Sequence, residues 1–200
     1  MTVDPKLLFP TPIWSLKAHS SLLESFPRII NKIQKDCEHG FINSNYNKSN
    51  KLGFQSPRYG LLGNPYLSRQ DSLSFRRTLQ DVVGIPEQDV IQVWVNCGYA
   101  SSYNIPHIHH SSMLSGVLYL KVPDGSGSIA FKDPRPQSIY SALYNNNFSG
   151  DTWYLKPLAK IAPFEGQILL FPSWLEHSVE SGDNQSDLRI SMPFNIASLL

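Results

Sequence analysis

Three of the six histidines lie together in the segment Pro106–His110. A proline favours extended backbone in the residue before it, and residues two positions apart in a strand point to the same face. The spacing therefore predicts that His107 and His109 share one face and that His110 points the other way. Neutral imidazole is a common ligand of iron, zinc, copper and nickel, so the pair would form half of a metal site. A polar strand with surface histidines is the alternative.

A second group of chemically capable residues lies near the end of the chain. His177 follows an apolar run over 167–174 and offers a third imidazole. Twelve residues later, Arg189 and Ser191 share one face of a predicted strand. A buried guanidinium requires an anion, and its planar fork matches a carboxylate. Asp187, on the same strand face at the adjoining turn, is one candidate for that anion.

The elements that must position these residues are mostly short strands. After Pro86, apolar, β-branched and aromatic runs alternate with turn residues, which indicates about eight strands. Before Pro86, apolar residues at three- and four-residue steps predict a helix from Leu22 to Ile33, which Pro27 kinks or restarts, and another from Leu73 to Val82. The predicted strands span 89–96, 106–110, 113–122, 127–133, 152–159, 166–171, 177–180 and 188–196.

The order of these elements predicts the fold class. Asp71 and Ser72 are expected to cap the second helix, and residues 7–14, interrupted by two prolines, form an edge strand at best. Helices first and many strands after indicate a mainly β fold with N-terminal helices (α+β), a helix-supported sandwich or barrel. The strands need the helices to cover a sheet face, so we expect one domain.

That domain would span residues 1–200, a length that can bury a core without metal or disulfide. We expect a region of helical support and loops over 1–86 and a strand core over 87–197. No internal repeat and no linker divides the chain.

Five segments of the strand-rich part share their order and spacing with a known family. They are the pair His107 and His109, SGVLYL at 115–120, FKDPRP at 131–136, GQILLFPSWLEH at 166–177 and RISMPFN at 189–195. In this order they resemble the iron(II)- and 2-oxoglutarate-dependent oxygenases, and most closely a subgroup of marine bacteria and their phages. The opening LFPTPIW is also similar to the opening of that subgroup.

The resemblance implies a double-stranded β-helix, which is a jelly-roll, cupin-like barrel, with Fe(II) at its mouth and 2-oxoglutarate and O₂ as co-substrates. His107 and His177 would be the proximal and distal ligands. His109 stands where the wider superfamily has Asp or Glu. Three neutral imidazoles leave the iron its full charge, which strengthens its attraction for anionic 2-oxoglutarate but loosens metal selectivity.

The same resemblance assigns roles in co-substrate binding. Arg189 would bind the distal carboxylate of 2-oxoglutarate with help from Ser191, and Tyr119 would donate a hydrogen bond to it. An ordinary core tyrosine is the alternative for Tyr119. The amide of Asn96, on the preceding strand, would contact 2-oxoglutarate or substrate. The implied reaction couples decarboxylation of 2-oxoglutarate to substrate oxidation, usually hydroxylation.

Two other functions remain open on these residues. A cupin-like three-histidine metalloenzyme without 2-oxoglutarate would use the same imidazoles, but it would place a Glu soon after them and leave Arg189 and Ser191 without a role. A non-catalytic jelly-roll binding module is the second, and it would fail to bind iron. The substrate, a small molecule or a peptide, is not predicted, and residues 40–70 and 136–152 are the expected lids.

Composition limits partners and location. Charged residues make up 16% of the chain and the net charge is +1, which argues against strong electrostatic binding to nucleic acid or anionic membranes. No apolar run reaches the roughly 18 residues of a transmembrane span, and the first residues show no signal peptide. Cys37 and Cys97 make no disulfide framework. We therefore expect a cytoplasmic protein, in the host cytoplasm if a phage encodes it.

Overall fold

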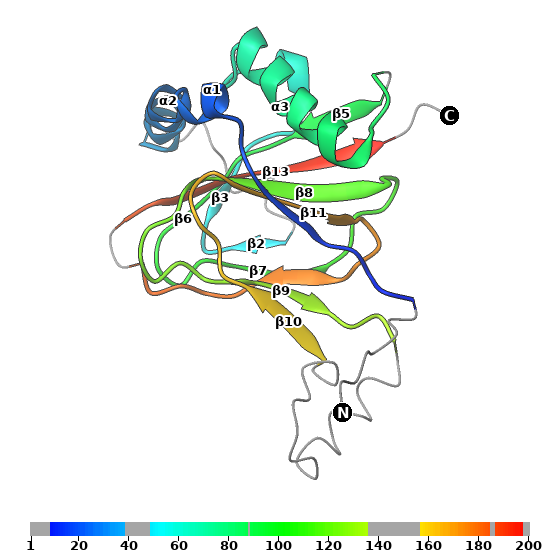
Figure 1. Ribbon diagram of the computed structural model, residues 1–200. Helices are drawn as coiled ribbons and strands as arrows, with labels where there is room; N and C mark the ends of the chain where they lie inside the picture. Colours follow the sequence, from blue (N-terminus) through cyan, green and yellow to red (C-terminus); the bar gives the residue numbers. More distant parts are fainter. Residues whose placement is uncertain (1–8, 39–48, 88, 136–156, 185–186, 198–200) are drawn as a thin grey trace, which may run out of the picture.

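The computed structural model describes residues 9–38, 49–87, 89–135, 157–184 and 187–197, and these form two antiparallel sheets with three α-helices on one side (Figure 1). The larger sheet has the order β1 (Trp14–Lys17), β11 (Gln167–Pro172), β8 (Leu114–Lys121), β13 (Arg189–Ala197), β5 (Val90–Val93) and β4 (Tyr59–Gly60). β6 (Asn96–Gly98) also pairs with β13, and β3 (Phe54–Gln55) pairs with β6. The smaller sheet has the order β10 (Leu158–Ile161), β9 (Ile129–Lys132), β12 (His177–Val179), β7 (Tyr103–His107) and β2 (Asn50–Lys51).

The two faces of the larger sheet bury different cores, because side chains alternate along each strand. Even-numbered residues of β8 and β13, such as Leu118 and Met192, pack with the helices. Odd-numbered residues, such as Val117 and Tyr119, face the smaller sheet and pack with Phe131. The space between the sheets is therefore lined by the odd-numbered set. This architecture confirms the predicted mainly β jelly roll with N-terminal helices.

The helices are α1 (Ser20–Leu23), α2 (Phe26–Glu38) and α3 (Arg69–Val83). Pro27 lies in the first turn of α2, where the missing N–H costs nothing, so it restarts the helix. The predicted caps of α3 are wrong: Ser68 is the N-cap, and Asp71 is the third helical residue of a capping box with it. Gly84 ends the helix in a left-handed conformation at φ 63°.

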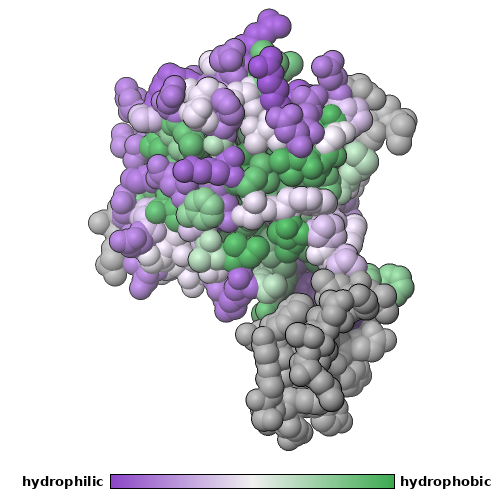
Figure 2. Space-filling view, viewed as in Figure 1, coloured by the Kyte–Doolittle hydropathy of each residue, from purple (hydrophilic) through white to green (hydrophobic). Residues whose placement is uncertain are grey.

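The helices present polar residues to solvent. In Figure 2 the surface over them is mainly hydrophilic, and more apolar surface lies below them over the sheets. In the part of the chain described, no helix is both long and apolar enough to cross a membrane.

The residues before Pro86 form four strands of the two sheets as well as the helices that cover the larger sheet. β1 pairs with β11 at the edge of the larger sheet, but it spans Trp14–Lys17 and so begins where the edge strand predicted over 7–14 ends. Of the described residues in that prediction, 9–13 form no strand, because Pro10 and Pro12 remove backbone donors there. β2, β3 and β4 come from the region predicted as loop, and each pairs with a strand of the core. The domain limits of 1–86 and 87–197 stay a prediction, but the two parts share both sheets.

Gly116 in the SGVLYL segment tests how tightly the larger sheet is packed. It lies opposite Phe194, and an added Cβ would lie 2.3 Å from that ring and 2.5 Å from the Leu169 carbonyl oxygen. We expect Gly116→Ala to lower the free energy of unfolding by about 1–3 kcal/mol, because a buried ring and a paired strand would have to shift. Gly63→Ala, with no atom within 4 Å of the added Cβ, should stay within about 0.5 kcal/mol of wild type. Denaturant unfolding measures both, and equal stability of the two variants would contradict the packing argument.

Candidate active site

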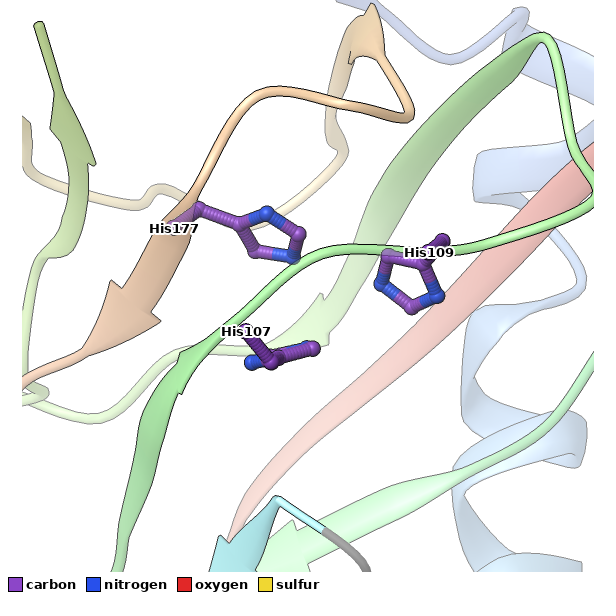
Figure 3. A group of neighbouring side chains, drawn as sticks. All are labelled: His107, His109 and His177. Carbon is purple, nitrogen blue, oxygen red and sulfur yellow. The ribbon is translucent and has the colours of Figure 1, made fainter. Parts of the chain in front are cut away.

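Three histidines converge between the two sheets (Figure 3). His107 ends β7 and His177 begins β12, and the two are direct cross-strand partners in the smaller sheet. His109 lies two residues beyond β7, with its ring stacked 5.1 Å from that of His177. The possible ligand nitrogens all lie within 4.8 Å of one another. His110 is exposed and lies outside this group.

Hydrogen bonds and burial prepare these imidazoles to bind a metal. Nδ1 of His107 lies 2.7 Å from the Ile105 carbonyl oxygen, and Nδ1 of His177 lies 2.9 Å from that of Leu175. Each Nδ1 therefore carries the proton and donates it, which leaves the Nε2 lone pair free. Burial lowers the pKa of His107, that of His177 to about 4 and that of His109 to about 3. At neutral pH all three rings are in the neutral form that ligates metals.

His109 reaches the cluster from a loop, which corrects the predicted strand over 106–110. β7 ends at His107, and His110 already lies in a turn. The backbone N–H of His109 donates a 2.9 Å hydrogen bond to the carbonyl oxygen of Ser173, in the turn after β11. This bond between loops, rather than strand alternation, holds the imidazole inward.

Among the described residues, no carboxylate joins the three histidines. Two carboxylates from the neighbouring segments form ion pairs instead: Asp133 pairs with Arg135 at 2.6 Å, and Glu176 pairs with Lys132 at 3.0 Å. The donor set is therefore three neutral imidazoles, which suits Fe(II) and other first-row metals.

The larger sheet forms the facing wall. In its register Ser191 of β13 lies directly opposite Asn96 of β6 on one side and Tyr119 of β8 on the other. Arg189 lies two residues before Ser191, on the same face. These four residues and the three histidines line one cavity of about 420 Å³. The structure thus brings together every site residue predicted from the sequence.

Several polar atoms of this wall have no partner. Nε of Arg189, the hydroxyl of Tyr119 and Oδ1 of Asn96 are buried without a hydrogen bond to any described residue. Asp187 is not the anion for Arg189, because it pairs with Lys121 at 2.6 Å. Burial lowers the pKa of Arg189 and raises that of Tyr119. Unsatisfied buried groups cost free energy, so their clustering indicates a site for a polar, anionic ligand.

Several cavity residues were not predicted as site residues, among them Trp94, Asn195 and Arg58. Trp94 shares strand parity with Asn96, and Asn195 shares it with Ser191, so the period-two rule could have found both. Arg58 lies in the irregular stretch between β3 and β4, where no periodic pattern signals it.

The predicted lids are described only in part. Residues 136–152 and 40–48 lie outside the described residues. The described portion of 40–70 contributes Ser49, Asn50, Gln55 and Arg58 to the cavity wall.

Comparisons with known proteins agree with this site. The profile of the family described as "Putative 2OG-Fe(II) oxygenase" (2OG being 2-oxoglutarate) matches residues 92–195, which is more than half of the chain. The chain belongs to this oxygenase family. Its cofactor is Fe(II), and its co-substrates are 2-oxoglutarate and O₂. The family is an oxidoreductase family, so the alternatives of a metalloenzyme without 2-oxoglutarate and of a non-catalytic module are wrong.

Solved structures show the same fold at low identity. A prolyl-4-hydroxylase from Pseudomonas putida has a TM-score of 0.59 at 11% identity, covering 94% of this chain and 92% of that chain. HygX from Streptomyces hygroscopicus, with nickel and 2-oxoglutarate bound, has a TM-score of 0.58 at 15% identity, covering 95% and 84%. The viral collagen prolyl hydroxylase of Paramecium Bursaria Chlorella virus-1 has a TM-score of 0.53 at 16% identity, covering 93% and 96%. No curated protein sequence matches the chain. The marine bacterial and phage subgroup stays a prediction.

The histidine cluster predicts which variants lose iron. Alanine at His107, at His109 or at His177 should abolish stoichiometric Fe(II) binding. Removing a residue that only hydrogen-bonds to a metal ligand lowers metal affinity roughly 10–100-fold, and removing a ligand itself should lower it more. His110→Ala, which removes an exposed neighbouring imidazole, should bind iron like wild type. Anaerobic equilibrium dialysis with iron analysis measures this. Loss of iron in His110→Ala with full binding in His109→Ala would overturn the assignment.

Proposed function

We propose that this oxygenase is a hydroxylase that binds Fe(II) through His107, His109 and His177 and 2-oxoglutarate through Arg189. The observation that carries the proposal is the guanidinium of Arg189, which has a buried Nε without a hydrogen bond and no ion pair among the described residues, and which lines one cavity with the three imidazoles. A metal bound by neutral ligands on one wall and the partly buried guanidinium of Arg189 on the other would together suit a dianion that binds both. The two prolyl hydroxylases of the same fold support hydroxylation as the outcome.

The residues present fit Fe(II) and 2-oxoglutarate. His107, His109 and His177 would hold Fe(II) through three neutral nitrogens, and the metal would then bind the co-substrate on its cavity side. Arg189, Ser191 and Tyr119 offer a guanidinium and two hydroxyls to the distal carboxylate, and charge-assisted hydrogen bonds of this kind are the strong ones. Asn96 adds an amide beside them. Fe(II), once bound, supplies the O₂ chemistry that couples decarboxylation of 2-oxoglutarate to substrate oxidation.

The chain itself contributes orientation and exclusion of water. The Ile105 and Leu175 carbonyls hold protons on Nδ1 of His107 and His177, so that Nε2 of each stays aimed into the cavity. Phe131 and Phe171 pack against the His177 ring at 6.2 and 4.7 Å between centroids and keep that side of the site dry. A dry site strengthens every electrostatic contact within it.

Arg189→Ala tests the co-substrate anchor. Leaving a buried carboxylate without its charged partner should weaken 2-oxoglutarate binding by about 3–5 kcal/mol. Titration of 2-oxoglutarate into anaerobic Fe(II)-loaded protein, followed by the metal-to-ligand charge-transfer band, measures the affinity. Arg77→Ala, which removes an exposed arginine of α3, should leave the affinity unchanged. Wild-type affinity in Arg189→Ala would refute the assignment.

His109→Asp and His109→Leu test the third ligand. Aspartate recreates the two-histidine, one-carboxylate ligand set, so this variant should keep iron and part of the 2-oxoglutarate turnover measured as succinate release. Leucine leaves two imidazoles and should lose both. His110→Leu is the matched control and should keep both. Full iron affinity and turnover in His109→Leu would show that His109 is not a ligand.

A further inference from the structure

One charged side chain of the cavity has no part in binding iron or 2-oxoglutarate. Arg58 precedes β4, one position beyond the paired residues Tyr59 and Val93, and so lies across from Trp94. Its Cζ atom lies 4.9 Å from the centroid of the Trp94 ring, within range of a cation–π interaction. The Trp94 ring lies 5.8 Å from that of His109. The guanidinium is therefore held on the wall next to the proposed third ligand.

The charges around the cavity are strongly unbalanced. Its described lining contains two arginines, Arg58 and Arg189, and no Asp, Glu or Lys. Arg58 forms no ion pair with any carboxylate of the described residues. Fe(II) and two guanidinium groups carry four positive charges, of which dianionic 2-oxoglutarate neutralises two. His109, in place of a ligand carboxylate, leaves this excess without an internal counter-charge.

Arg189 lies deep in the cavity and Arg58 lies at its exposed edge, so the two arginines are suited to different ligands. Nε of Arg189 is fully buried beside Tyr119, which suits a co-substrate that binds deep in the barrel. Arg58 is exposed where it borders the cavity, so a ligand arriving from solvent meets it directly. Positive potential at such a cleft attracts anions and raises their local concentration.

We infer that Arg58 binds an oxyanion of the primary substrate, a carboxylate or a phosphate, and so makes this oxygenase selective for an anionic substrate. The inference rests on the proposed function, because it places the substrate beside His109. A planar guanidinium fork held on an aromatic face can bind two oxygens of a carboxylate or a phosphate with defined geometry. Gln55 also lines the cavity and offers an amide to the rest of a polar substrate. Asn50 and Asn104 line it too, and their Nδ2 atoms already donate to the Phe54 carbonyl and the Ser49 hydroxyl.

Binding of a small anion tests this inference without knowledge of the substrate. The probe is trifluoroacetate, and trifluoroacetamide is its uncharged counterpart of similar size. Each is titrated, with fluorine NMR line widths as readout, into anaerobic protein saturated with Fe(II) and 2-oxoglutarate. Wild type should prefer the anion by at least about tenfold, and Arg58→Gln should lose that preference. Arg58→Lys, which keeps the charge, should retain most of it, and Arg77→Gln should bind like wild type.

The outcomes separate the two proposals. The charge-transfer band should be the same in wild type and Arg58→Gln, because Arg58 is not assigned to 2-oxoglutarate. Absence of the band in wild type would contradict the proposed function and this inference with it. With the band present, equal binding of the two probes, no binding of the anion, or unchanged anion binding in Arg58→Gln would contradict the role of Arg58 alone.

Discussion

The active site depends on a guanidinium that the fold places between two sheets without an anion. Arg189 has its Nε buried and unbonded among the described residues, and the carboxylate closest in sequence, Asp187, pairs with Lys121 instead. Desolvating a cation without a counter-charge is costly, and a folded domain has only about 5–15 kcal/mol of net stability to set against such costs. The arrangement is accounted for by a ligand that carries the missing charge.

The three imidazoles lie across the cavity from that guanidinium. His107 and His177 are cross-strand partners, so one strand pairing fixes two ligands at once. Because the ligands are neutral, the metal keeps its full charge and the cavity holds a positive centre on each wall. A dianion bound between them satisfies both. The metal site and the co-substrate site therefore stabilise one another and need not be strong separately.

Strand alternation explains how much of this site could be predicted from the sequence. Arg189 and Ser191 share a face by parity, and Tyr119 belongs to the inward set of β8 for the same reason. His109 was predicted correctly to lie near His107 but for the wrong reason, since a loop held by Ser173 positions it. Which strands are neighbours, and hence that Ser191 lies between Asn96 and Tyr119, depends on long-range pairing that no local pattern encodes.

Local sequence patterns were not enough to predict the start of α3 or the position of Arg58. The cap of α3 was placed three residues too late because Asp71 and Ser68 are both good cap residues, and only the capping box decides between them. Arg58 lies in an irregular segment whose cavity-facing side is fixed by the ring of Trp94. Tertiary contacts of this kind override local preference.

An anaerobic crystal structure of the protein with Fe(II) and 2-oxoglutarate tests the central claim most directly. The account predicts iron bound to Nε2 of His107 and His177 and to the His109 ring, with the distal carboxylate of 2-oxoglutarate on Arg189. Iron held by Asp133, Glu176 or His110, or a distal carboxylate bound away from Arg189, would contradict it.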